Sequence, residues 1–213
     1  MSLVRLSRDQ SGSTAAEFGL VLPLLMLLLF GVIDTGRWIW TYNQAEKATQ
    51  MGARFAIVAD GIAGSAASSN GIYSSYLGVS GLTQGDVIPA SAFGKITCTG
   101  SGSGATISAT CVCTTAPCPS GSTTATTAAF TNVLTRMQRF LPELTASNLK
   151  VEYSSSGLGY AGSPTLPDLS PLVTVEISGM AFRPLTILAI KPVTMPSFTT
   201  TLSAEDLSGS VSN

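Results

Sequence analysis

The chain has 213 residues, of which 45% are hydrophobic and only 11% are charged, and its net charge at pH 7 is −1. This balance gives no electrostatic basis for binding nucleic acid. The sequence contains no histidine, which removes the commonest general base and a frequent metal ligand. The length suffices for one membrane segment and one compact domain.

An apolar run from Phe18 to Ile33 dominates the N-terminal part, after a short head that carries Arg5 and Arg8. The run does not end in a small-x-small site, so we expect it to be retained rather than removed as a secretory signal. A helix from Glu17 to Trp38 would be about 32 Å long, close to a hydrocarbon core of about 30 Å. A buried helix of a soluble domain is the alternative, but the run offers no polar face. We therefore predict a membrane span over about residues 17–38, with the basic head in the cytoplasm.

The span carries residues that are typical of membrane helices. Trp38 and Trp40 fall where an aromatic belt is expected, and Asp34 and Arg37 can pair on one helical face. Pro23 predicts a kink or a locally relaxed helix, which membrane helices tolerate. The membrane-anchor residues that we single out are Phe18, Pro23, Phe30, Trp38 and Trp40.

The helical pattern continues beyond the span. Side chains on one face recur every three or four residues as far as Ala59, and the pair Asp60-Gly61 then gives a stop signal. The residues that form this face are Trp38, Tyr42, Ala45, Thr49, Gly52, Ala56 and Ala59. We predict one long helix over residues 13–60 and a separate domain over residues 61–213.

Glu17 stands at the edge of the apolar run, where an ionised carboxylate needs a wet position or a partner. It lies five residues after Gly12 and is followed by Phe18. Glycine, four residues, glutamate and an aromatic before an apolar run resemble the prepilin-peptidase site of Flp-type (Tad) pili. The wider string over residues 10–60 resembles the TadE-like family, the minor pilins or pseudopilins of tight-adherence pilus systems.

This resemblance implies that residues 1–12 form a cytoplasmic leader, cleaved between Gly12 and Ser13 by a prepilin peptidase. Glu17 and Phe18 would then be assembly contacts, with the Glu17 carboxylate facing the new α-ammonium group of a neighbouring subunit. The alternative for Glu17 is solvation among lipid head groups. The partners implied are other pilin or pseudopilin subunits, the peptidase, an inner-membrane pilus assembly platform and the lipid bilayer. The domain would then be periplasmic or, in a pilus, at the cell surface.

The remaining chain predicts an α+β domain. Alternating β-forming residues at 95–99 and 105–113 indicate a hairpin, and an amphipathic pattern over 129–141 indicates a helix. Further strands are expected at 149–153, 172–178 and 197–202, and the Gly/Ser/Ala-rich residues 61–85 indicate a loop or a loosely helical surface segment. Residues 182–190 read as a short apolar helical turn or a membrane-facing patch. The predicted fold is pilin-like: a long N-terminal helix packed on a small, mainly antiparallel sheet with one further helix.

Four cysteines lie close together, which is typical of an oxidising compartment and allows three pairings. The predicted hairpin could place Cys98 opposite Cys111, leaving Cys113 and Cys118 to close a small loop, although the sequence does not settle this pairing. A zinc site is the alternative, but it lacks the usual Cys-x2-Cys spacing.

Candidate catalytic groups are sparse. A serine nucleophile would need a lysine base in the absence of histidine, and none of the lysines lies in a recognisable motif; these are Lys47, Lys95, Lys150 and Lys191. We therefore expect no enzyme activity, cofactor or metal, and predict a structural pilus protein. The alternative is a single-pass, membrane-anchored periplasmic binding module that is neither processed nor incorporated into a filament.

Overall fold

The computed structural model describes residues 11–163, 167–185, 191–205 and 207. The chain divides into two compact units, one containing residues up to 41 together with 181–194, and the other containing 42–180 and the residues from 195 onwards. Helix α2, Ser11–Ala56, supplies residues to both units. The fold is α+β with a long N-terminal helix, as the sequence predicted.

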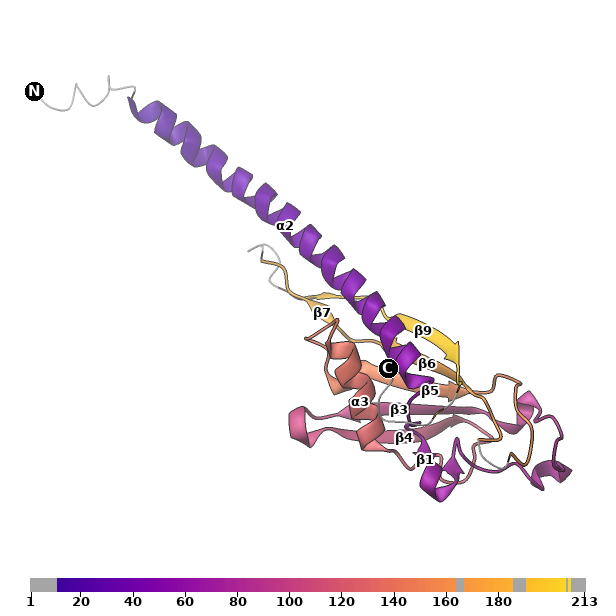
Figure 1. The fold of residues 1–213 in the computed structure, drawn as a ribbon. Helices are drawn as coiled ribbons and strands as arrows, with labels where there is room; N and C mark the ends of the chain where they lie inside the picture. The colour runs from indigo at the N-terminus through magenta and orange to yellow at the C-terminus, as the bar shows by residue number, and fades with distance from the viewer. Residues whose placement is uncertain (1–10, 164–166, 186–190, 206, 208–213) are drawn as a thin grey trace, which may run out of the picture. The chain divides into compact units, whose positions relative to one another are not determined.

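The larger unit contains a five-stranded antiparallel sheet with the strand order β4-β3-β5-β6-β9 (Figure 1). Sequence neighbours pair in the β3–β4 and β5–β6 hairpins, and β9 adds to the edge formed by β6. The strands are β3 (Lys95–Ser101), β4 (Ser108–Thr115), β5 (Leu149–Ser154), β6 (Leu172–Ile177) and β9 (Phe198–Ser203). The predicted strands are thus confirmed, with ends that differ by a few residues.

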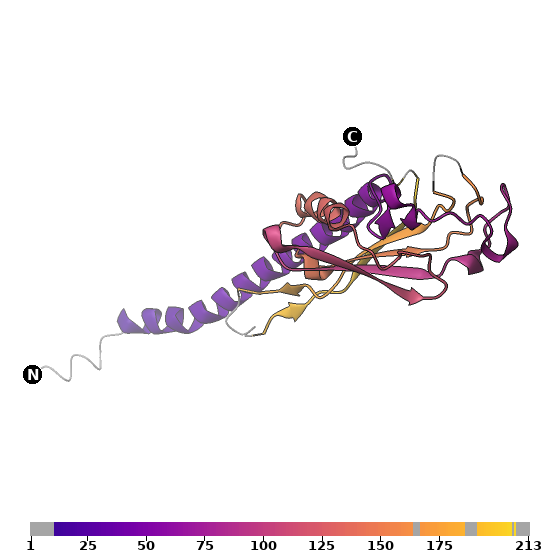
Figure 2. The same ribbon diagram turned by 90° about the horizontal axis from the view of Figure 1, so that it is seen from below.

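Helix α3, Thr127–Gln138, and the last turns of α2 lie on the same face of this sheet (Figure 2). The buried side chains of α3 recur at helical spacing: Ala129, Phe130, Val133, Leu134 and Met137. Strands β5 and β6 alternate buried and partly exposed residues along their length. This alternation is typical of an antiparallel sheet with one face on the core and the other in water.

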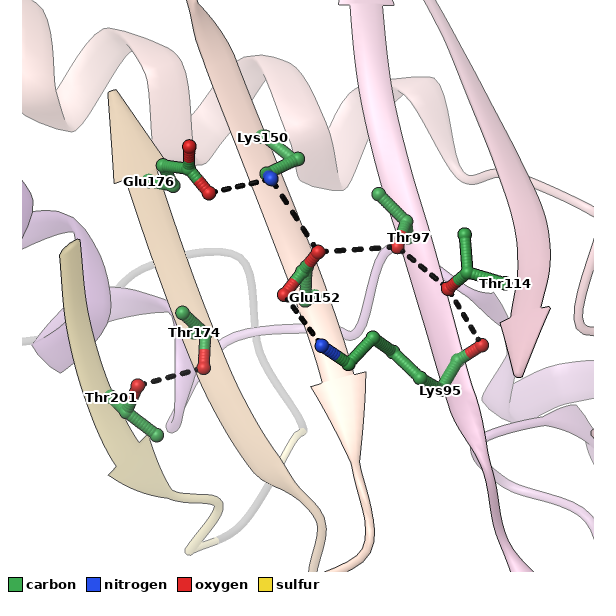
Figure 3. A network of polar contacts seen from close by, with 8 residues as sticks. All are labelled: Lys95, Thr97, Thr114, Lys150, Glu152, Thr174, Glu176 and Thr201. Atoms are coloured by element: carbon green, nitrogen blue, oxygen red, sulfur yellow. Dashed lines mark hydrogen bonds and ion pairs between the residues drawn. The ribbon is translucent and has the colours of Figure 1, made fainter. Parts of the chain in front are cut away.

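The opposite face of the sheet carries a polar network (Figure 3). Lys150 Nζ lies 2.5 Å from Glu176 Oε2 and 3.5 Å from Glu152 Oε1, and Lys95 Nζ lies 3.4 Å from Glu152 Oε2. The hydrogen bond to Glu176, more than the nearby charges, raises the pKa of Lys150 against its partial burial. Thr97 Oγ1 extends the network to Thr114 Oγ1 at 2.9 Å. These partly exposed pairs fill the solvent face and contribute little to stability.

The connecting segments are tied to the core by the hydroxyl groups of two tyrosines, the buried Tyr153 and the partly buried Tyr73. The amide of Ile62 donates to Tyr153 Oη at 3.0 Å, and the amide of Gly61 donates to Tyr73 Oη at 2.6 Å. Burial raises the pKa of both phenols. Short elements in these segments are β1 (Gly64–Ser65), η1 (Ala66–Ser68), β2 (Asn70–Gly71), η2 (Val79–Gly81), η3 (Ala90–Ala92), η4 (Gly104–Thr106) and η5 (Ala146–Asn148). The segment 61–85, which we expected to be a loop or loosely helical, contains two short 3-10 turns, η1 and η2, and the two-residue strands β1 and β2.

The smaller unit contains the first part of α2 and a two-stranded antiparallel pair, β7 (Ala181–Phe182) with β8 (Val193–Thr194). The sequence did not indicate that residues 181–194 group with the N-terminal helix. The prediction of a helical turn over 182–190 is wrong at Phe182, which lies in strand β7. Residues 186–190 lie outside the described part of the chain.

Candidate anchoring and assembly site

The first part of α2 exposes nearly all of its large apolar side chains. An amphipathic helix of a soluble domain would bury one face, but here the exposed residues surround the helix. They are Phe18, Leu20, Val21, Leu22, Leu24, Leu25, Met26, Leu27, Leu28, Leu29, Phe30, Val32 and Ile33. This helix is long and apolar enough to cross a membrane, judged by length and composition.

The predicted processing and assembly residues lie at the start of this surface. Gly12 is in the first turn of α2 and is exposed, and Glu17 and Phe18 follow on the same helix with exposed side chains. The side chain of Ser13 and the leader residues 1–10 lie outside the described part of the chain. The structure thus places a carboxylate and an aromatic ring at consecutive exposed positions of the helix, where the apolar surface begins.

The predicted anchor residues lie along the same helix. α2 is continuous through Pro23, so a kink there stays a prediction. Phe30 is exposed, and Trp40 near the other end is 68% exposed, whereas Trp38 is half-buried. The two tryptophans therefore differ in their exposure, although the sequence pattern predicted the same aromatic belt for both.

The predicted pair of Asp34 and Arg37 forms, with Arg37 Nη1 3.2 Å from Asp34 Oδ1. Asp34 is buried, and the same Oδ1 also accepts a hydrogen bond from the amide of Leu185 at 2.8 Å. The Arg37 guanidinium lies 5.3 Å from the centre of the Phe182 ring, within cation–π range. Sequence reasoning found the charged pair but missed Phe182 and Leu185, because their contacts join segments far apart in the chain.

The glycines of α2 fall into two kinds. A Cβ atom added to Gly19, Gly31 or Gly36 would meet nothing within 4 Å, whereas one added to Gly52 would lie 2.6 Å from Met137 Sδ. Gly52 is therefore required by packing inside the larger unit. The three open glycines each cost the helix about 1 kcal/mol relative to alanine, and packing within the described residues does not account for them. Glycines on membrane helices allow a second helix to approach closely.

All four cysteines form disulfides, Cys98 with Cys111 and Cys113 with Cys118. Cys98 and Cys111 face each other directly in the β3–β4 register. These are the pairs that the predicted hairpin suggested, and they leave no thiolate for zinc at this cluster.

Asp168 organises a group of loops that sequence reasoning did not single out. Its Oδ2 accepts hydrogen bonds from the amides of Tyr76 (2.7 Å) and Gly162 (2.9 Å) and from Ser75 Oγ (3.2 Å), and its Oδ1 accepts one from the amide of Ser163 (2.8 Å). Burial opposes ionisation, but these hydrogen bonds outweigh it and the pKa of Asp168 is lowered. Both oxygens are engaged by the protein's own groups, so the carboxylate acts as a structural acceptor. A lone aspartate before Leu in a Gly/Pro-rich loop gave no sequence signal for this role.

The structure thus defines a class of protein, in which an exposed apolar helix able to span a membrane is joined in sequence to a disulfide-bonded α+β domain. Residues 12–54 match the family model described as TadE-like protein. The match begins at Gly12 and ends near the end of α2, so the resemblance to the TadE-like family is confirmed for this segment. Comparisons with curated proteins and with solved structures find no match.

Proposed function

We propose that the chain is a minor pilin or pseudopilin that takes part in assembling a Tad (Flp-type) pilus. The observation that carries the proposal is the TadE-like match over residues 12–54, which includes the exposed apolar surface of α2 and begins at the expected cleavage glycine. The proposal assigns no catalytic step to the chain.

In this proposal the prepilin peptidase cuts between Gly12 and Ser13 on the cytoplasmic side of the inner membrane. The cut creates an α-ammonium group close to the membrane boundary, where Glu17 also lies. Each charge alone is penalised at this boundary, and pairing between neighbouring subunits offsets the penalty. Glu17 would therefore favour association of processed subunits over unprocessed ones.

The remaining features fit this arrangement. The open glycines Gly19, Gly31 and Gly36 would let apolar helices of neighbouring subunits approach within a filament or an assembly intermediate. The two disulfides suit an oxidising compartment, and they support a periplasmic position for the domain. The assembly platform in the inner membrane would receive the helix before it leaves the bilayer.

Mass spectrometry of the chain isolated from its own cells tests the processing step. We expect a mature N-terminus at Ser13 in cells with the peptidase and an intact Met1 in cells without it. Gly12→Leu should block the cut because a bulky side chain keeps the backbone from lying close in the protease groove, and Gly19→Leu serves as the matched control that leaves it unaffected.

An intact Met1 in peptidase-positive cells would contradict the proposal. It would favour the alternative of an unprocessed, membrane-anchored binding module in the periplasm.

A further inference from the structure

The segments that contain strands β7 and β8 contact α2 at Asp34 and Arg37, within one turn of the helix. The amide of Leu185 donates to Asp34 Oδ1 at 2.8 Å, and Phe182 lies against the Arg37 guanidinium at 5.3 Å. Asp34, Arg37 and residues 181–194 all belong to the smaller unit. These contacts therefore hold the strand pair beside the turn of α2 that contains Asp34 and Arg37.

That level lies close to the outer boundary of the predicted span. Asp34 is about 26 Å along the helix from Glu17, and a hydrocarbon core is about 30 Å thick. With Glu17 at the cytoplasmic boundary, Leu185 lies just inside the outer edge of the hydrocarbon. Backbone amides near hydrocarbon need a partner in the protein because water is scarce there, and the Asp34 carboxylate supplies one to Leu185.

The exposed side chains of this segment have the composition of an interfacial membrane contact. Leu185 is 59% exposed and Val193 is 49% exposed. Arg183 and Lys191 are exposed as well. Long basic side chains can place their stems beside acyl chains while their charges reach lipid phosphates.

We propose that residues 181–185 and 191–194 form a second membrane contact, which lies in the outer interface of the bilayer beside α2. Leu185 and Val193 enter the acyl region, and Arg183 and Lys191 bind phospholipid phosphates. This inference rests on the proposed membrane anchoring by α2. The chain would then contact the bilayer through two segments that are distant in sequence. The second contact would fix how deeply α2 lies in the bilayer and how it is rotated about its axis.

Tryptophan fluorescence of the full chain in vesicles tests this contact. The background is Trp38→Phe with Trp40→Phe, and the vesicles contain phosphatidylcholine and phosphatidylglycerol, with bromine near the head-group end of the acyl chains. A tryptophan introduced by Leu185→Trp should show blue-shifted emission and strong quenching by the brominated lipid. One introduced by Leu158→Trp, at a position 61% exposed in the larger unit, should show neither change.

A third variant, Val32→Trp, reports on the span itself. Quenching at Val32→Trp without quenching at Leu185→Trp would overturn this inference alone. Absence of quenching at both positions would overturn the membrane anchoring and the inference with it. Blue-shifted but unquenched emission at Leu185→Trp would assign the surface to a protein neighbour and overturn the lipid contact.

Asp34 provides a second test in the Leu185→Trp background. Asp34→Asn keeps a carbonyl oxygen that can accept from the Leu185 amide, whereas Asp34→Ala removes the acceptor. We expect quenching at position 185 to persist in the asparagine variant and to fall towards the Leu158→Trp level in the alanine variant. Full quenching in both variants would overturn the role of Asp34 in holding the segment at the bilayer.

Discussion

The two parts of helix α2 differ in what they expose and bury. Up to Thr41 the helix exposes leucines, phenylalanines and other large apolar residues, whereas from Tyr42 to Ala56 it buries small ones such as Ala45, Ala48 and Gly52. Large apolar residues normally form the core, and their exposure marks a surface that meets another apolar medium. The comparison teaches that the size and the burial of the side chains, more than their hydrophobicity, distinguish the part of α2 that packs in the domain core from the part that is able to span a membrane.

A negative charge introduced into each part should give the largest and most clearly separated effects. Ala48 is fully buried in the larger unit, so Ala48→Asp should lower the free energy of unfolding by about 3–5 kcal/mol because the carboxylate is left uncompensated. Leu25→Asp should leave that quantity unchanged and weaken membrane integration by about 3 kcal/mol. Urea unfolding of the full chain in micelles, followed by near-UV circular dichroism, measures the first effect, and vesicle flotation measures the second. An unfolding midpoint for Ala48→Asp equal to that of the wild type would contradict the conclusion that this part of α2 packs in the domain core.

Substituting glycines from the two parts sharpens the comparison at the level of packing. Gly52→Leu should destabilise the larger unit by about 3 kcal/mol, because its side chain must displace Met137 from a filled core. Gly31→Leu should not destabilise the chain, since the space around that glycine is open. If Gly31 contacts a neighbouring subunit, the same variant should reduce pilus assembly while its membrane level stays normal. Equal destabilisation by both substitutions, measured by urea unfolding, would remove the distinction between them.

The free energy of unfolding of the larger unit should depend on pH through Asp168, which lies outside the predicted membrane span. Asp168→Asn should lower the free energy of unfolding by about 2 kcal/mol at pH 7, because hydrogen bonds to a charged group are lost. The folded pKa of Asp168 is lowered, so its stabilisation is complete above the unfolded value of about 3.9 and disappears as the pH falls through the folded value. The difference between wild type and variant should therefore shrink below about pH 4. A constant difference between pH 7 and pH 3 would show that ionisation of Asp168 is not involved.

The polar face of the sheet should give the smallest effect. Lys150→Met removes two ion pairs that are partly exposed and should change the free energy of unfolding by about 0.5 kcal/mol. Raising the salt concentration should reduce the difference further, because exposed charges are screened. Loss of several kcal/mol in the same unfolding assay would mean that this network stabilises the domain as strongly as the buried face.

Much of the fold could be predicted from the sequence, because the relevant signals are local. The apolar run, the small-residue face up to Ala59 and the alternation around Val151 and Val175 are repeats within single elements. The pair of Asp34 and Arg37 was predictable for the same reason, since residues three apart on a helix are neighbours.

The missed features depend on contacts between distant segments. Leu185 reaches Asp34, and Asp168 reaches the amide of Tyr76, across long stretches of chain that no periodic pattern connects. The open space around Gly31 could not be predicted either, because the sequence does not show which glycines meet a neighbour within the chain. The proposed role of the apolar surface in pilus assembly could be inferred only from the ordered string Gly12 to Phe18, which resembles a processing site.

The central claim is that Glu17 acts in assembly rather than in anchoring, and one measurement tests it most directly. The yield of surface pili is compared between wild-type cells and cells carrying Glu17→Ala, at matched levels of the chain in the membrane. We expect normal membrane insertion and few or no pili in the variant, because the carboxylate that would pair with a neighbouring α-ammonium group is gone. Normal piliation with a processed Glu17→Ala chain would contradict the claim.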